Sequence, residues 1–159
     1  MGIPGAEAGR YLSFILGEES YAIPVEMVEV VLETPAVTRV PNAIPHMRGV
    51  INYRGSVVPI VDPRLRFDGT PIALDDTTSV IVLQMRYEGE EVVVGMLADG
   101  VREVVEIPIE SVERAPSMGS RTAEKFIAGV AKLGDGFVVL LDVEAAFSKS
   151  ENVVVGGRS

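Results

Sequence analysis

The chain has 159 residues, with 14 Lys plus Arg against 23 Asp plus Glu, so its net charge at pH 7 is −9. This length allows one sizeable core, and the excess of acid disfavours binding to nucleic-acid backbones or to anionic membrane surfaces. Cysteine is absent, which excludes disulfides, thiolate metal sites and a cysteine nucleophile, and agrees with a reducing, cytoplasmic location.

The ends of the chain carry few structural signals. Residues 1–10 are expected to form a disordered leader and residues 148–159 a flexible tail, because neither stretch has apolar periodicity. The apolar runs in between stop at Asp99 and Asp142, well short of the ~18 residues that a membrane helix requires. We therefore expect no direct insertion into a membrane.

The first strands follow the leader. From Tyr11 the chain alternates, with Leu12, Phe14 and Leu16 on one side, and a turn at Gly17 leads into a second strand at 21–25. Valines at helical spacing between Pro24 and Leu32 predict one or two helical turns after that strand.

A stronger hairpin signal lies in the middle of the first half. Two apolar runs, 50–51 and 57–61, flank Arg54-Gly55, which supplies the turn. Pro59 has no N–H for a sheet ladder, so its strand is expected at an edge or with that position turned outward. Asp62 followed by a proline predicts an N-cap and the first turn of a short helix.

The second half repeats this order after an irregular connection at residues 67–78. Its predicted elements are strands at 79–85, 92–97, 101–107 and within 129–143, a single helical turn at 123–127 and a short helix at 144–148.

The two halves are related in sequence. Residues 49–62 align without a gap with residues 129–142, a shift of 129 − 49 = 80. Hydrophobic residues make up 47% of the chain but aromatic residues only 6%, which favours Val-rich strands. We interpret the chain as one mainly β domain, 11–147, made of two small barrels from repeats at about 11–67 and 80–147, since closure removes exposed strand edges. The alternative to a duplication is that the two segments are similar only because any two β-hairpins share apolar runs and glycine turns.

These residues resemble a known family. The motif Gly-Val-Ile-Asn-Tyr-Arg-Gly-Ser-Val-Val-Pro-Ile-Val-Asp at 49–62, with Tyr-Ala-Ile-Pro-Val-Glu at 21–26 before it and Gly-Met-Leu-Ala-Asp-Gly-Val at 95–101 after it, resembles CheW, the coupling protein of bacterial chemotaxis. The likeness runs from about Tyr11 to Phe147. It implies two five-stranded SH3-like barrels, with a few short helices, packed together along a hydrophobic seam and a groove.

The resemblance also implies a function. A CheW-like protein is a non-catalytic adaptor without a cofactor, and its partners are the regulatory domain of the histidine kinase CheA and the helical cytoplasmic tips of methyl-accepting chemotaxis receptors. Such a protein is expected to be a monomer when free and to be recruited to the inner face of the membrane through receptor arrays. The alternative is a coupling protein of a non-flagellar chemosensory pathway, whose output is surface motility or another response.

Seven positions match the family's receptor-facing residues. They are Val28 and Val30 in the predicted helical segment, Gly49 and Arg54 in the central motif, and Val80, Gly95 and Val104 in the second repeat. An amphipathic receptor helix would place its apolar stripe on the valines, and Arg54 would pair with a carboxylate or lock its own loop. Core packing is the alternative for the valines, and a solvated tip or an internal ion pair is the alternative for Arg54.

One position departs from the family pattern. Many members have glutamate where Val30 stands, as the second repeat has Glu103 (103 − 30 = 73), whereas the acid here is Glu29. On a helix, moving the acid by one residue turns its charge about 100° around the helix axis. Either Glu29 substitutes through a local slip, or the receptor has a different surface charge.

Catalytic motifs are scarce. The single histidine, His46, cannot build a zinc site, and no phosphate-binding glycine loop is present. Asp62 and Asp142 are expected to act as helix caps. A small enzyme with a carboxylate-lined groove and a nucleic-acid-binding module remain the alternatives from other classes, and the net charge disfavours the second.

Overall fold

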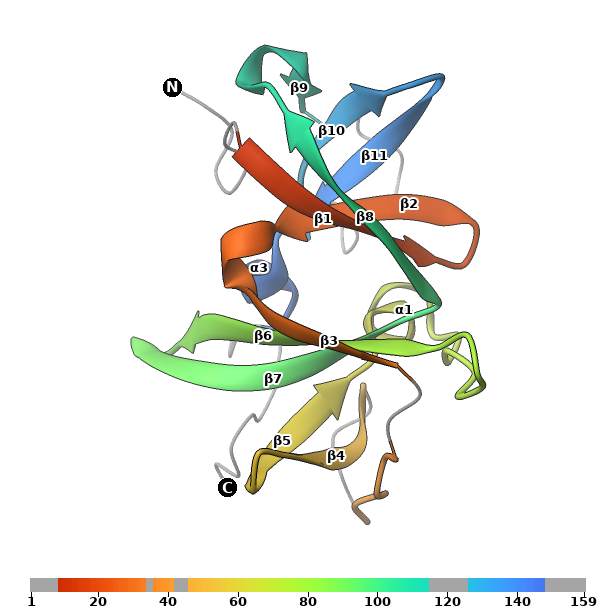
Figure 1. Ribbon diagram of the computed structural model, residues 1–159, viewed down its shortest axis with the longest axis vertical. Helices are drawn as coiled ribbons and strands as arrows, with labels where there is room; N and C mark the ends of the chain where they lie inside the picture. The colour runs from red at the N-terminus through yellow and green to blue at the C-terminus, as the bar shows by residue number, and fades with distance from the viewer. Residues whose placement is uncertain (1–8, 34–35, 42–45, 115–125, 148–159) are drawn as a thin grey trace.

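The computed structural model describes residues 9–33, 36–41, 46–114 and 126–147. Most of the expected leader, the tail and most of the helical turn expected at 123–127 lie outside these ranges. The fold is mainly β, as predicted, and consists of two twisted sheets that lie one above the other in Figure 1.

The six-stranded sheet has the order β8-β1-β2-β11-β10-β9, and the five-stranded sheet has the order β3-β6-β7-β5-β4. The strands of the six-stranded sheet are β1 (Gly9–Leu16), β2 (Glu19–Pro24), β8 (Gly100–Ile107), β9 (Val112–Glu113), β10 (Ile127–Leu133) and β11 (Gly136–Leu141). Those of the five-stranded sheet are β3 (Val28–Glu33), β4 (Met47–Tyr53), β5 (Ser56–Val61), β6 (Ser79–Tyr87) and β7 (Glu90–Ala98). Short helices are η1 (Val25–Met27), α1 (Pro63–Asp68), η2 (Ile109–Ser111) and α3 (Val143–Ala146).

Neither sheet is built from one repeat. The hairpin β1–β2 of the first repeat pairs with β8 and β11 of the second repeat, and the hairpin β6–β7 of the second repeat pairs with β3 and β5 of the first. The sequence interpretation placed each barrel within one repeat. The strand pairing shows instead that the repeats have exchanged their leading hairpins, which residue order alone does not reveal.

Each sheet is brought toward closure by the segment that follows its edge strand. In the five-stranded sheet, Thr38 lies after β3 and exchanges two backbone hydrogen bonds of 2.8 and 2.9 Å with Val50 of β4. In the six-stranded sheet, β9 follows β8 and pairs with β10. In each sheet this segment covers part of the opposite edge, the reason for which barrels were predicted.

The prediction of one or two helical turns between Pro24 and Leu32 is wrong for most of that segment. Only η1 is helical, and the valines that follow form β3, in which Val28 pairs with Leu83 and Val31 pairs with Ile81. β-branched side chains fit a pleated, half-buried surface, and the tertiary pairing with β6 outweighs the helical spacing.

The central hairpin β4–β5 is confirmed. β5 is an inner strand, so Pro59 does not lie on an edge. Val50 lies opposite Pro59, and its N–H and C=O are bonded to Thr38 on the other side of β4. The backbone nitrogen of Pro59 therefore also points away from β4. It lies one residue before Ile60, where β5 begins to pair with β7. The missing N–H therefore falls where no ladder bond is needed.

The main core lies between the two sheets and inside the five-stranded one, and a smaller cluster fills the six-stranded one. Two ring contacts join the repeats: His46 lies 5.7 Å from Phe147, and Phe67 lies 5.4 Å from Phe126, measured between ring centroids. These residues are equivalent in pairs, since 126 − 46 = 80 and 147 − 67 = 80. The seam is therefore built reciprocally, one ring from each repeat in each pair.

Within the described parts of the chain, no helix combines the length and the apolar composition required to span a membrane.

Candidate functional site

Three of the positions matched to the family's receptor-facing residues lie inside the protein. Gly49, Val80 and Gly95 are buried. A Cβ on Gly49 would come within 2.9 Å of the carbonyl carbon of Thr38, and a Cβ on Gly95 would come within 2.5 Å of Ile60 Cδ1 and 2.7 Å of Val80 Cγ1. These residues let strands and side chains approach closely, so they support a surface and do not form it.

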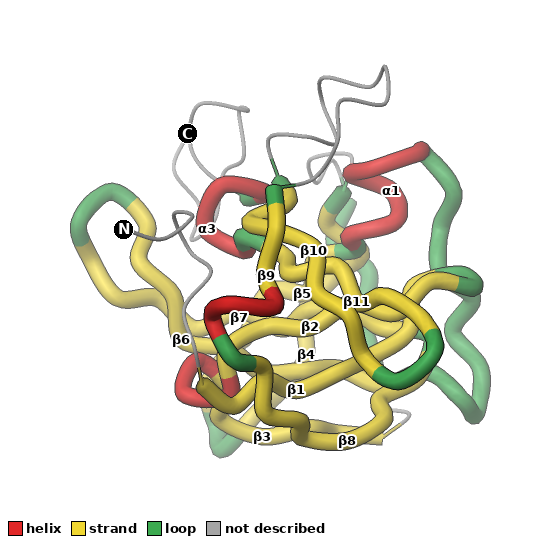
Figure 2. Tube along the Cα trace, turned by 90° about the horizontal axis from the view of Figure 1, so that it is seen from above, coloured by secondary structure: helices red, strands yellow, loops and turns green. Residues whose placement is uncertain are grey.

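The other matched positions lie on or near the surface. Val28 and Val30 are half-buried on β3, Arg54 lies at the tip of the β4–β5 hairpin, and Val104 on β8 keeps 43% of its surface exposed. β3 is one edge strand of the five-stranded sheet and β8 is one edge strand of the six-stranded sheet, and they lie on the same face of the molecule, in front in Figure 1 and along the lower edge of Figure 2. Val104 is exposed on that face, whereas Val28 and Val30 also pack against the main core, the alternative offered for the valines from sequence.

Glu29 occupies a β-bulge. The register of β3 against β6 shifts between Val28 and Val30, and Glu29 is the extra residue. Its Oε1 accepts a hydrogen bond of 3.1 Å from Gln84 Nε2, and its Oε2 lies 3.9 Å from Arg54 Nη1. A bulge re-aims a side chain. The bulge brings this carboxylate to Arg54.

Tyr53 completes this surface cluster. Its hydroxyl donates a hydrogen bond of 3.2 Å to Glu29 Oε2, and its ring lies 5.2 Å from the guanidinium carbon of Arg54. The pKa of Tyr53 is raised by desolvation and also by the Glu29 carboxylate, although Arg54 acts in the opposite direction. The phenol therefore stays protonated and remains a donor at neutral pH.

Arg54 adopts a left-handed backbone conformation, with φ of 55°, at the hairpin turn. Its side chain is 76% exposed, so its guanidinium remains available to a partner beside its contact with Glu29. A planar guanidinium in this position can bind a carboxylate with two parallel hydrogen bonds. The internal ion pair and the exposed tip, both proposed as alternatives from sequence, are present together.

A groove of about 440 Å³ opens beside this cluster, between β5 and β7. Its lining residues are Glu29, Tyr53, Arg54, Ser56, Val57, Val58, Pro59, Val92 and Val93. Val57 keeps 74% of its surface exposed, and its counterpart in the second repeat, Phe137 (137 − 57 = 80), keeps 65%. Sequence analysis missed both, although an apolar residue just after a hairpin turn was visible at each position.

A larger groove, of about 600 Å³, lies between β1, η1, β6 and α3. It contains four carboxylates, as the enzyme alternative requires, but three of them are engaged in the fold. Glu144 Oε2 accepts a hydrogen bond of 2.9 Å from the backbone N–H of Arg86, the guanidinium of Arg86 lies 3.9 Å from Glu91, and Asp142 caps α3 through the N–H of Ala145. Among the described residues, no group of three or more His, Asp or Glu side chains could hold a metal ion.

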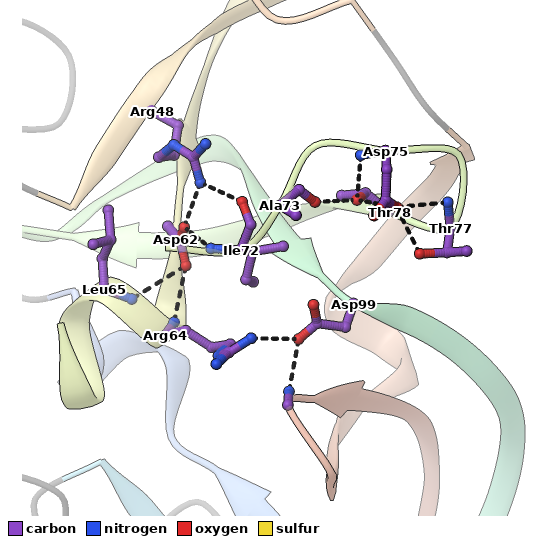
Figure 3. A network of polar contacts seen from close by, with 11 residues as sticks. Arg48, Asp62, Arg64, Leu65, Ile72, Ala73, Asp75, Thr77, Thr78 and Asp99 are labelled. Atoms are coloured by element: carbon purple, nitrogen blue, oxygen red, sulfur yellow. Dashed lines mark hydrogen bonds and ion pairs between the residues drawn. The ribbon is translucent and has the colours of Figure 1, made fainter. Parts of the chain in front are cut away.

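Asp62 is a cap, as predicted, and it is completely buried. One oxygen accepts hydrogen bonds from the N–H groups of Arg64 and Leu65, and the other accepts from Arg48 Nη1 at 2.6 Å and from the N–H of Ile72 at 2.9 Å, as Figure 3 shows. All of its acceptor capacity serves the fold.

His46 is buried and lies at the seam. Its Nε2 has no hydrogen-bond partner among the described residues, and burial, together with the positive charge of Arg66, lowers the pKa of His46 to about 4. Its ring packs on Phe147. The position serves packing.

Comparison with known proteins places the chain among close structural and sequence relatives. A family model described as the CheW-like domain matches residues 10–151. The chemotaxis protein CheW of Klebsiella aerogenes is 34% identical over 154 residues, covering 96% of this chain and 90% of its own, and that of Bacillus subtilis is 27% identical over 143 residues, covering 90% and 89%. The crystal structure of the scaffolding protein TtCheW from Thermoanaerobacter tengcongensis matches with a TM-score of 0.76 at 25% identity, covering 88% of this chain and 92% of that one. Sequence and fold point to the same kind of protein over nearly the whole chain.

Proposed function

The chain belongs to the CheW family, a family of non-catalytic chemotaxis scaffolds, and on that premise we propose that it couples chemoreceptor tips to the histidine kinase CheA. It acts by binding both partners at once in a cytoplasmic array held at the membrane by the receptors. It makes and breaks no bond itself.

The observation that carries this proposal is the shared face of β3 and β8. Val104 exposes apolar surface there from β8, and the half-buried Val28 and Val30 of β3 add the parts that their packing against the main core leaves uncovered, which suits the apolar stripe of an amphipathic helix. The cluster of Glu29, Tyr53 and Arg54 lies beside β3 and supplies charge at the margin of that surface. An apolar centre with a charged margin is the arrangement of many protein interfaces.

Arg54→Ala tests the receptor part of the proposal. We expect the variant to bind receptor signalling domains about tenfold more weakly in co-sedimentation, because a helix carboxylate loses its guanidinium partner. Its free energy of unfolding should change by less than about 1 kcal/mol, because the ion pair with Glu29 is solvent-exposed.

The matched control is Arg86→Ala. Arg86 is also exposed and also lies 3.9 Å from a glutamate, but on the β6–β7 hairpin, outside the cluster around Arg54. It should leave receptor binding unchanged. Equal binding by the wild type and both variants would contradict the assignment of Arg54, and absence of binding to both receptor and CheA would contradict the proposed function itself.

A further inference from the structure

The exchange of leading hairpins makes each sheet depend on both repeats. β1 pairs with β8 along its length, from Gly9 opposite Ile107 to Ile15 opposite Gly100, and β6 pairs in the same way with β3. The ring contacts of the seam also join one repeat to the other. A single connection, residues 69–78, joins the two repeats along the chain.

That connection is fixed at both ends. At its start, Ile72 is buried and held by the first repeat, because its N–H donates to Asp62 Oδ2 and its carbonyl oxygen accepts from Arg48 Nη1 at 2.8 Å. At its end, Ser79 begins β6. The stretch between these two points, residues 73–78, is the hinge.

The hinge is closed by local hydrogen bonds. The N–H of Thr78 donates to the carbonyl oxygen of Asp75 at 3.1 Å, Thr78 Oγ1 donates to the carbonyl oxygen of Ala73 at 2.5 Å, and the N–H of Thr77 donates to Asp75 Oδ1 at 2.9 Å. Figure 3 shows this turn beside the buried cluster around Asp62. Residues 73–77 are exposed, so opening the turn uncovers little apolar surface apart from Leu74, which is already half-exposed.

We propose that a second copy of this chain can take the place of either repeat, so that two chains form a dimer by exchanging whole repeats across an opened hinge. Each two-barrel unit in that dimer contains the first repeat of one chain and the second repeat of the other. All strand pairs and seam contacts between the repeats are kept, and the turn at 73–78 is lost. Exchange of an identical element is a low-cost route to a dimer for this reason.

The partner copy would complete both grooves. The groove beside Arg54 takes Glu29, Tyr53 and Val57 from the first repeat and Val92 and Val93 from the second. In the dimer these two sets come from different chains, so one assembly carries two complete copies of each surface. The dimer can therefore form whether or not these surfaces bind the partners proposed above.

Engineered disulfides test the exchange directly, because the natural chain has no cysteine. Arg10 and Glu106 are opposite each other on β1 and β8, are both exposed and belong to different repeats. Lys132 and Phe137 are opposite each other on β10 and β11, are also both exposed and belong to the same repeat. Facing strand positions are within the Cα separation that a disulfide requires.

The full-length pair Arg10→Cys with Glu106→Cys is refolded from urea at micromolar and at millimolar concentration, the dimer is isolated by size exclusion, and both fractions are oxidised. On a non-reducing gel we expect the dimer fraction to give a covalent dimer and the monomer fraction a monomer. The control pair, Lys132→Cys with Phe137→Cys, should give a monomer band from both fractions.

A variant of the hinge makes the test independent of how much dimer the natural sequence yields. Asp76→Pro with Thr77→Pro removes the N–H of Thr77 and disfavours the turn, so the dimer fraction should rise about tenfold at equal concentration. A dimer in which the pair at 10 and 106 stays within one chain would overturn the proposal. So would the absence of a dimer from concentrated refolding of both the natural hinge and the proline variant.

Discussion

His46 and Phe126 occupy equivalent positions in the two repeats. The carbonyl oxygen of His46 accepts a hydrogen bond of 2.8 Å from the N–H of Asp62, and that of Phe126 accepts one of the same length from the N–H of Asp142. Both rings pack at the seam, His46 tilted against Phe147 and Phe126 stacked on Phe67. The first repeat therefore places a titratable ring where the second has a purely apolar one.

This difference predicts a pH-dependent stability. The pKa of His46 is lowered to about 4 in the folded protein, against about 6.5 in an unfolded chain, so the unfolded state binds the extra proton between these values. The stability that depends on a neutral His46 is therefore fully present above pH 6.5, and it is lost as the pH falls from 6.5 toward 4. Between pH 7 and pH 5 the free energy of unfolding, measured by urea titration, should fall by about 2 kcal/mol.

The control is His46→Phe, which copies the second repeat at the equivalent position. Because His46 is the single histidine of the chain, this variant should lose the pH dependence between pH 7 and pH 5. An equally steep loss of stability in His46→Phe would show that other groups cause it.

At the scale of elements, the two short helices are capped in the same way but anchored differently. Asp62 holds α1, the connection at Ile72 and the guanidinium of Arg48, whereas Asp142 holds one N–H of α3. The second repeat has Ala128 at the position equivalent to Arg48 (128 − 48 = 80). One repeat therefore has a buried ion pair where the other has a simple cap.

Asp62→Ala and Asp142→Ala should differ accordingly. Removing Asp62 leaves Arg48 and three N–H groups without their acceptor, which should cost about 3–5 kcal/mol of unfolding free energy. Removing Asp142 should cost about 1 kcal/mol, the usual value of an N-cap. Both values come from urea denaturation at pH 7, and similar losses in the two variants would contradict the anchoring role given to Asp62.

At the scale of the whole molecule, the exchanged hairpins couple the two sheets. Ile23 lies in the six-stranded sheet and Ile60 in the five-stranded one, both fully buried, and the main core includes residues of both sheets. Neither repeat can keep its strand partners when the other unfolds. The chain should therefore unfold as one cooperative unit.

Calorimetry of Ile23→Val and Ile60→Val tests this coupling. Each substitution should destabilise by about 0.5–1.5 kcal/mol, and each should lower the midpoint of one and the same transition. The ratio of van't Hoff to calorimetric enthalpy should remain near one. Two separate transitions, with one of them shifted by each variant, would show that the sheets fold independently.

The sequence alone determined the local features of this protein. The turn at Arg54, the cap at Asp62 and the strands around them follow from residue chemistry within a few positions, and the gapless motif at 49–62 and 129–142 indicated both the duplication and the family. Local chemistry is readable in this way because its partners are neighbours in the chain.

The tertiary structure decided what depends on distant strands. Pairing with β6 turned the predicted helix around Val28 into a strand, and the bulge at Glu29 brought its carboxylate to Arg54. The exchange of hairpins between repeats was decided in the same way, because similar repeats offer similar strand edges and sequence order does not say which edge is chosen.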